Sequence, residues 1–221
     1  MDVRRWCIVM VAAGAVVFAS PAAAAAGVVA QWNMDEVSGS TAFDSSGNGN
    51  NGVSTNVTLG LPGRSGASGD HGYGFNGHSS TMVIPKRASL AAGNAEVTVT
   101  MDVRTSVEPG TGNFDYDLWS KGGYQVEIFP KNGVGQAKCK FIGSITHSTI
   151  QAGPDLADGQ WHTITCHKGA TSISVTVDGT TYTKQVSIGT LNTGGKAWVG
   201  VGSNLTDYYN GELDDLTVSF N

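Results

Sequence analysis

The chain has 221 residues, of which 31 are glycine, and its 18 acidic and 13 basic side chains give a net charge of −5. No cluster of Lys and Arg is present to neutralise phosphates, which argues against a nucleic-acid-binding protein. The length fits one domain of the larger all-β type and leaves little room for a second.

The first 26 residues predict a secretory signal peptide. Arg4 and Arg5 form a short positive start, the apolar run 6–18 follows, and the small residues 22–26 offer a cleavage site. An apolar run of about 13 residues is too short to span a bilayer comfortably, so no membrane span is expected. We therefore predict a signal peptide over 1–26, one domain over 27–221, and export to the extracellular space.

The rest of the chain is dominated by alternation of apolar and polar residues, which predicts strands with one face on a core and the other in water. The dipeptide Asp178-Gly179 predicts a tight hairpin between two of these strands. One helical turn is expected at 87–93, and the fold class is all-β, a two-sheet antiparallel β-sandwich or jelly roll. In chain order, strands are expected at 28–34, 73–76, 80–84, 97–104, 117–120, 124–129, 137–143, 161–167, 173–178, 180–186, 196–202 and 211–220.

Two cysteines, Cys139 and Cys166, lie beyond the predicted cleavage point. Both fall in strand-like segments, and an even pair in an oxidising compartment is most simply a disulfide. The alternative is a metal site or a catalytic thiol, but the chain has no C-x-x-C motif and no supporting histidine cluster. We therefore predict a structural disulfide between Cys139 and Cys166.

Five motifs in a fixed order resemble one known family. They are the segment 29–36 (VAQWNMDE), the loop 42–52 (AFDSSGNGNNG), the turn 73–77 (YGFNG), the pair 158–164 (DGQWHTI) and 175–179 (VTVDG), and the closing segment 210–218 (NGELDDLTV). This succession resembles the bacterial laminin-G-like domains of the concanavalin A-like lectin/glucanase superfamily, over essentially the whole mature chain. The resemblance implies a jelly roll whose first and last strands pair, and, in many members, a structural calcium site. The family is functionally mixed, so the resemblance does not assign an activity.

The implied pairing of the first and last strands would bring Asp214 and Asp215 close to the polar loop that begins at Asp44. Calcium takes six to eight oxygen ligands from carboxylates, amides and backbone carbonyls. The loop offers the carboxylate of Asp44 and the amide oxygens of Asn48 and Asn50. We expect a structural calcium ion held by these five residues. The alternative is an ordinary polar turn, because Asp, Ser, Gly and Asn are common turn residues.

The segment 212–217 is similar to the Glu-x-Asp-x-x-Glu strand that supplies both catalytic carboxyls in glucanases of this fold. Retaining hydrolysis needs two carboxyls about 5–5.5 Å apart. Thr217 stands where the last Glu would be, so the second catalytic carboxyl is missing. A lyase with a histidine and a tyrosine is another option, with Tyr124, His147 and Tyr208 as candidates. No catalytic residue is assigned, and an enzyme is the less favoured interpretation.

Glycan binding needs aromatic faces for sugar rings and polar groups for hydroxyls. The candidates are aromatic residues in or near loops that break the strand alternation: Phe114, Tyr116, Tyr208 and Tyr209. The alternative is that one tyrosine of the 208–209 pair packs in the core together with Trp119. Three other tryptophans lie within expected strands and are predicted to be core residues: Trp32, Trp161 and Trp198.

These features favour a secreted, calcium-stabilised carbohydrate-binding module that is a monomer and has a polysaccharide or glycan as its partner. The first alternative is a small secreted polysaccharide lyase or glycoside hydrolase on the same fold. The second is a protein-binding laminin-G-like adhesion domain. Retention on a glycan without product, release of sugars, or affinity for a protein would distinguish these three.

Overall fold

A computed structural model of the chain describes residues 27–110 and 115–221. The predicted signal peptide over 1–26 lies outside the described residues, and so does Phe114. Within the described part the regular structure is β except for one 3-10 turn, η1 (Ala88–Leu90), which confirms the all-β prediction and the helical turn expected at 87–93. In these two ranges no helix has the length and hydropathy needed to cross a membrane.

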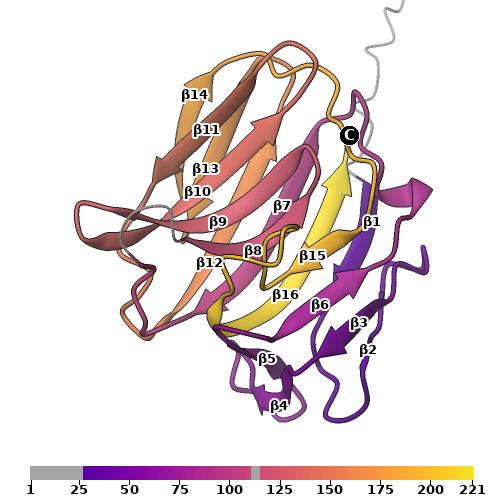
Figure 1. Ribbon diagram of the computed structural model, residues 1–221, viewed down its shortest axis with the longest axis vertical. Helices are drawn as coiled ribbons and strands as arrows, with labels where there is room; N and C mark the ends of the chain where they lie inside the picture. The colour runs from indigo at the N-terminus through magenta and orange to yellow at the C-terminus, as the bar shows by residue number, and fades with distance from the viewer. Residues whose placement is uncertain (1–26, 111–114) are drawn as a thin grey trace, which may run out of the picture.

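Two antiparallel eight-stranded sheets, named A and B, pack face to face. Sheet B lies toward the viewer in Figure 1. Sheet A contains, in spatial order, β14 (Thr180–Gln185), β13 (Ser172–Val177), β12 (Trp161–Lys168), β7 (Val97–Arg104), β16 (Asn210–Phe220), β5 (His71–Asn76) and β4 (Thr58–Pro62), with β1 (Gly27–Trp32) also paired to β16. Sheet B contains β11 (His147–Ala152), β10 (Val134–Ile142), β9 (Tyr124–Lys131), β8 (Tyr116–Lys121), β15 (Ala197–Val199), β6 (Thr81–Ile84), β3 (Gly52–Thr55) and β2 (Thr41–Ala42).

The last strand, β16, is central to sheet A and joins the two ends of the chain. It pairs with β7 along one edge and with β5 and β1 along the other, where Trp32 lies opposite Leu216. The implied pairing of first and last strands is therefore confirmed. The hairpin β13–β14 turns at Asp178 and Gly179, whose φ angles of 48° and 82° are those of the two-residue turn that follows the natural twist of paired strands.

Alternate residues of the strands fill the core between the two sheets. In β7 the odd-numbered apolar residues from Val97 to Val103 are all buried, as the period-two pattern predicts. The centre of the core is aromatic, because Trp119 packs against Trp32 and Tyr124 with ring centroids 5.9 Å apart in each pair. The core position predicted for Trp32 is confirmed, as is the alternative that places Trp119 there.

Cys139 of β10 and Cys166 of β12 form a disulfide, which confirms the predicted pair. Their Cα atoms are 5.6 Å apart, and both side chains are buried. Since β10 belongs to sheet B and β12 to sheet A, the bridge ties the two sheets together through the core.

Candidate functional site

The loop that begins at Asp44 is held by its own hydrogen bonds. The Asp44 carboxylate accepts N–H groups from Gln31 (3.0 Å), Ser46 (3.0 Å) and Asn50 (2.7 Å). Burial raises the pKa of Asp44, but these bonds outweigh it and hold the pKa below its usual value. The amides of Asn48 and Asn50 donate to backbone carbonyls of β1. These contacts resemble those of a polar turn, and calcium binding by this loop stays a prediction.

Asp214 and Asp215 lie at a β-bulge of β16, where the register with β7 shifts. Asp214 is fully buried and accepts N–H groups from Arg64 (2.8 Å) and Asp215 (2.9 Å). Burial raises the pKa of Asp214, the bond from Arg64 lowers it, and repulsion from Asp215 and Asp70 raises it again, to about 7. Within residues 27–110 and 115–221, no hydrogen bond links this pair to the loop at Asp44.

The glucanase-like segment occupies β16 of sheet A. Glu212 forms an ion pair with Arg104 of β7, so its carboxylate is engaged in the sheet itself. The bulge between Asp214 and Thr217 also breaks the alternation that would align two carboxyls on one face. The carboxylate of Glu212 in this incomplete motif is therefore paired with an arginine of the neighbouring strand.

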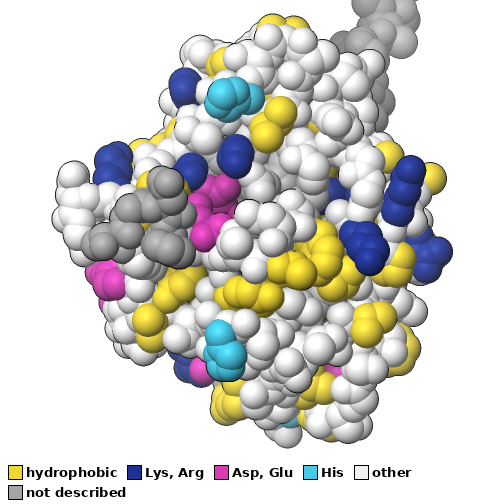
Figure 2. All heavy atoms as spheres, in the orientation of Figure 1, with side chains coloured by type: hydrophobic (Ala, Val, Ile, Leu, Met, Phe, Trp, Pro, Cys, Tyr) yellow, Lys and Arg dark blue, Asp and Glu magenta, His cyan; other side chains and the backbone are white. Residues whose placement is uncertain are grey.

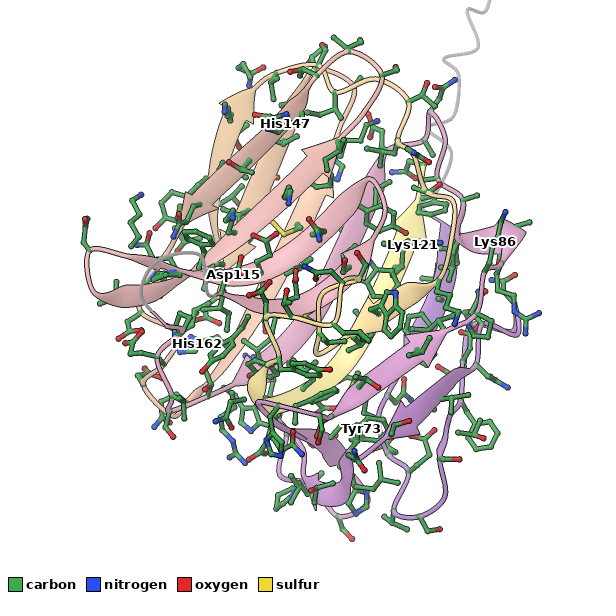
Figure 3. The ribbon with its side chains drawn as sticks, viewed as in Figure 1. Tyr73, Lys86, Asp115, Lys121, His147 and His162 are labelled. Atoms are coloured by element: carbon green, nitrogen blue, oxygen red, sulfur yellow. A yellow bond between two sulfur atoms is a disulfide. The ribbon has the colours of Figure 1, made fainter. Side chains whose placement is uncertain are left out.

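The three residues considered for a lyase lie in different surroundings. Tyr124 is buried in the core, whereas His147 is exposed at the start of β11. Tyr208 lines a hollow together with Asp115, and Figure 3 shows His147 well apart from Asp115. The structure does not bring these three side chains together.

The best candidate site is a hollow of about 380 Å³ at the rim of the sandwich, beside the first residues of β8. Figure 2 shows acidic side chains gathered near the middle of the face toward the viewer, with basic side chains close by. Two of the predicted ligand-binding residues, Tyr116 and Tyr208, lie in this one hollow. Its lining includes Gly110, Asp115, Tyr116, Thr206, Asp207 and Tyr208.

Tyr209 does not reach this hollow, and its prediction as a ligand-binding residue is wrong. Its side chain is fully buried, its hydroxyl donates to the carbonyl of Arg104 (2.9 Å), and its ring meets Tyr116 edge-on with centroids 5.6 Å apart. Neighbouring residues of an extended segment point to opposite sides, so Tyr209 enters the core where Tyr208 faces outward. Tyr116 is itself 9% exposed, which leaves Tyr208 as the more accessible aromatic residue.

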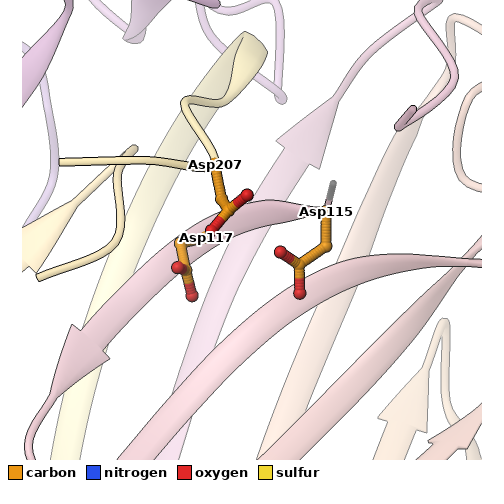
Figure 4. Close-up of side chains that lie close together, drawn as sticks. All are labelled: Asp115, Asp117 and Asp207. Carbon is orange, nitrogen blue, oxygen red and sulfur yellow. The ribbon is translucent and has the colours of Figure 1, made fainter. Parts of the chain in front are cut away.

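Three carboxylates meet at the side of this hollow (Figure 4). Oxygens of Asp115, Asp117 and Asp207 all lie within 4.8 Å of one another, and in the described part of the chain no other group of three Asp, Glu, His or Cys side chains does so. Asp115 directly precedes β8, Asp117 is its second residue, and Asp207 comes from the loop before β16. This cluster was not predicted from the sequence, although Asp115-Tyr116-Asp117 at a strand start and Asp207 beside Tyr208 are visible in it.

The negative charge of the cluster is only partly balanced. Glu127 lies opposite Asp117 on β9 and pairs with Lys138 at 2.6 Å, while the same lysine is 3.9 Å from Asp115. Burial and repulsion from Glu127, Asp115 and Asp207 raise the pKa of Asp117 to about 8. Burial and the charge of Glu127 also raise the pKa of Asp115. These carboxylates therefore hold protons more strongly than isolated surface carboxylates do.

Trp198 was expected in the core, and the structure corrects that expectation. Its neighbours Ala197 and Val199 are fully buried, so Trp198 points to the outer face of sheet B, where it is half-buried. It lies directly opposite Ser120 of β8, whose hydroxyl accepts a hydrogen bond from the Gln125 amide (3.0 Å). This face therefore presents an indole near polar groups. Trp161, also expected in the core, is half-buried as well.

His162 is held between two carboxylates. Its Nδ1 lies 2.6 Å from Asp178 Oδ2 and its Nε2 lies 3.1 Å from Asp158 Oδ1. Burial lowers the pKa of His162, but the two carboxylates raise it by more, so the pKa of the folded state is above the ordinary value. Such a histidine contributes stability that is complete below the unfolded pKa of about 6.5 and is lost as pH rises through the folded value.

We therefore expect His162→Gln to remove part of the pH dependence of folding stability. Wild type should lose stability relative to this variant as pH rises from about 6 through the raised pKa of His162. Urea denaturation across that range measures the free energy of unfolding of each protein. Taking the difference between the two proteins removes the contribution of the buried aspartates, which titrate in the same range in both. His147→Gln, at an exposed position, serves as the control. Parallel curves for wild type and His162→Gln would contradict the assignment.

A sequence model described as the concanavalin A-like lectin/glucanases superfamily, of laminin-G type, matches residues 75–219. No curated protein matches the chain in sequence.

Solved structures share the fold at low sequence identity. Domain 4 of AbnA, a GH43 extracellular arabinanase from Geobacillus stearothermophilus in complex with arabinotriose, has a TM-score of 0.62 and 15% identity over 89% of this chain and 93% of that one. The receptor binding domain of botulinum neurotoxin mosaic serotype C/D has a TM-score of 0.64 and 9% identity, covering 87% of this chain and 47% of its own. Domains LG4-5 of the mouse laminin α1 chain have a TM-score of 0.52 and 16% identity, covering 67% and 42%. At such identities the likeness shows the fold alone.

Proposed function

The chain belongs to the laminin-G-like family of the concanavalin A-like lectin/glucanase superfamily, and from that premise we propose that it is a secreted, monomeric carbohydrate-binding module. The observation that carries the proposal is the rim hollow, where Tyr208 and Tyr116 lie beside the carboxylates of Asp115 and Asp207. A volume of about 380 Å³ is within the range of small-molecule sites. An aromatic wall beside hydrogen-bond acceptors suits a sugar, whose rings are apolar on their faces and whose hydroxyls donate at their edges.

A longer glycan has a second platform on the outer face of sheet B. Trp198 lies opposite Ser120 of β8, the strand whose first residues form the hollow. A chain of sugars would stack one ring on Tyr208 and a further ring on Trp198, with the amide of Gln125 available to hydroxyls between them. Aromatic anchors of this kind supply most of the binding energy of an interface, while the surrounding polar groups supply complementarity.

Two further observations support an extracellular glycan as the partner. A disulfide that ties both sheets together is typical of proteins that work in an oxidising compartment. The arabinanase domain that shares this fold was solved with arabinotriose and aligns over nearly the whole chain.

We expect Tyr208→Ala and Trp198→Ala each to weaken glycan binding by at least about tenfold, because each removes an aromatic anchor worth roughly 2 kcal/mol. The test is retention of the purified protein on a panel of polysaccharides, with released reducing ends and unsaturated products measured in the same samples. Tyr182→Ala is the matched control, because Tyr182 is 39% exposed on the edge strand β14 of sheet A, away from the hollow.

The possible results of this experiment distinguish a binding module, an enzyme and an adhesion domain. Retention without product, lost in the two variants and kept in the control, supports a carbohydrate-binding module. Release of sugars would mean a lyase or hydrolase on the same fold. Failure to bind any glycan, together with affinity for a protein, would mean an adhesion domain. If Tyr208→Ala binds glycan as tightly as wild type, the glycan-binding site lies elsewhere on the surface.

A further inference from the structure

We infer that Asp115, Asp117 and Asp207 bind a divalent cation of the calcium type at the rim of the sandwich. This site differs from the one expected at Asp44 and Asp214. It goes beyond the proposed glycan binding and does not depend on it, because the ligands are protein groups that are in place without a sugar.

The spacing of the three carboxylates suits one ion. Calcium binds oxygens at about 2.3–2.6 Å, so ligands on opposite sides of the ion lie about 5 Å apart. One carboxylate oxygen from each of Asp115, Asp117 and Asp207 lies within 4.8 Å of the other two, and Figure 4 shows the three side chains close together. One ion can therefore contact all three without movement of the strands.

A buried oxygen of Asp117 provides the second, independent observation. Asp117 is 6% exposed, and its Oδ1 has no hydrogen-bond partner among residues 27–110 and 115–221. Buried carboxylate oxygens are normally paired, because burying an unpaired charge is costly. No lysine or arginine of these described residues forms an ion pair with Asp117, and Nζ of Lys138 is committed to Glu127 at 2.6 Å. A cation among the three aspartates would give this oxygen the partner that the protein does not.

The loop before β16 is shaped to bring further oxygens to the same place. A side chain at Gly202 would place its Cβ 2.5 Å from Asp117 Oδ2 and 2.7 Å from Asn204 Oδ1, so glycine leaves room for the two oxygens. The hydroxyl of Thr206 lies 2.6 Å from Asp207 Oδ2 and 2.9 Å from Asn204 Oδ1, which orients both groups. The Asn204 amide oxygen is therefore a fourth candidate ligand.

The donor set selects among metals. The cluster contains oxygen donors and no histidine or cysteine, which favours a hard cation over zinc or copper. Carboxylates and an amide from a strand and a loop suit the flexible coordination of calcium better than the small, regular octahedron of magnesium. Asp115 and Asp207 also line the rim hollow, which gives the ion an entry path and space for water or ligand oxygens.

The test is calorimetric titration of calcium chloride into the purified, EDTA-treated protein, with melting curves at each calcium concentration. We expect calcium to bind and the melting temperature to rise with calcium concentration, because the ion binds the folded state. Asp117→Asn and Asp207→Asn should each weaken calcium binding by at least about tenfold. Glu96→Gln is the matched control and should bind calcium like wild type, because this carboxylate accepts the N–H of Ala170 and lies outside both candidate calcium sites. Magnesium chloride in place of calcium should give weaker binding.

A stability measurement keeps this test independent of folding defects. Without calcium and at about pH 9, Asp117→Asn should melt at or above the temperature of wild type, because a neutral amide then replaces a buried ionised carboxylate. The inference is overturned if calcium produces no heat and no shift in melting temperature. It is equally overturned if Asp44→Asn loses calcium binding while Asp117→Asn retains it, since the ion would then lie in the loop at Asp44.

Discussion

Replacing both Cys139 and Cys166 with alanine is expected to lower the free energy of unfolding by about 3–4 kcal/mol. The two residues are 27 positions apart in sequence and join β10 of sheet B to β12 of sheet A. Without the bridge the unfolded chain gains conformational freedom, and the contact between sheets relies on packing alone. The loss is a large share of the 5–15 kcal/mol that typically stabilises a domain.

Urea denaturation of wild type and the double variant measures this difference directly. Wild type in reducing buffer should unfold at a midpoint close to that of the double variant, whereas the variant should not respond to reductant. Equal midpoints for wild type and variant under oxidising conditions would contradict a stabilising role for the bridge.

Trp119→Ala is expected to lower the free energy of unfolding by about 3–5 kcal/mol, the usual range for an aromatic side chain removed from a core. Trp119 has no exposed surface and packs between Trp32 and Tyr124, so the substitution leaves a cavity that strands cannot easily collapse into. Trp119→Phe should cost less, because it keeps most of the ring contacts. It also removes an indole N–H that has no partner among the described residues.

Trp198→Ala is the matched control for this prediction. Trp198 lies in the adjacent strand β15 of the same sheet but points outward, so its loss should change stability by about 1 kcal/mol or less. Denaturation midpoints of the two alanine variants measured side by side provide the comparison. Similar losses of unfolding free energy in both variants would contradict the stabilising role that the packing of Trp119 indicates.

The fold class was accessible from sequence because its signals are local. Alternation over 97–104 and the Asp178-Gly179 dipeptide each predict one strand or one hairpin without reference to the rest of the chain, and both are confirmed. The two cysteines beyond the predicted cleavage point allow a single intrachain bridge, so the disulfide was predictable as well. Strands with weak alternation were missed, and pairing with their neighbours is what forms them: β2, β3, β4 and β11.

Alternation predicts that a segment is a strand, but it does not decide which set of alternate residues faces the core. The segment at Trp198 fits an inward or an outward indole equally well, and the burial of Ala197 and Val199 decides for outward. The same holds for the Tyr208–Tyr209 pair, where packing against Tyr116 takes Tyr209 into the core. Which aromatic residue can meet a ligand is therefore a tertiary property.

The sequence by itself determined an all-β chain with its principal strands, one tight hairpin and one disulfide, because each of these depends on residues close in sequence or on a single available partner. Only the tertiary structure brought Asp207 to Asp115 and Asp117, and only it showed which oxygens of Asp44 and Asp214 are already bound by N–H groups. The physical reason is that charge clusters form through sheet register and loop closure between distant segments. Composition and periodicity contain no information about which distant carboxylates will meet.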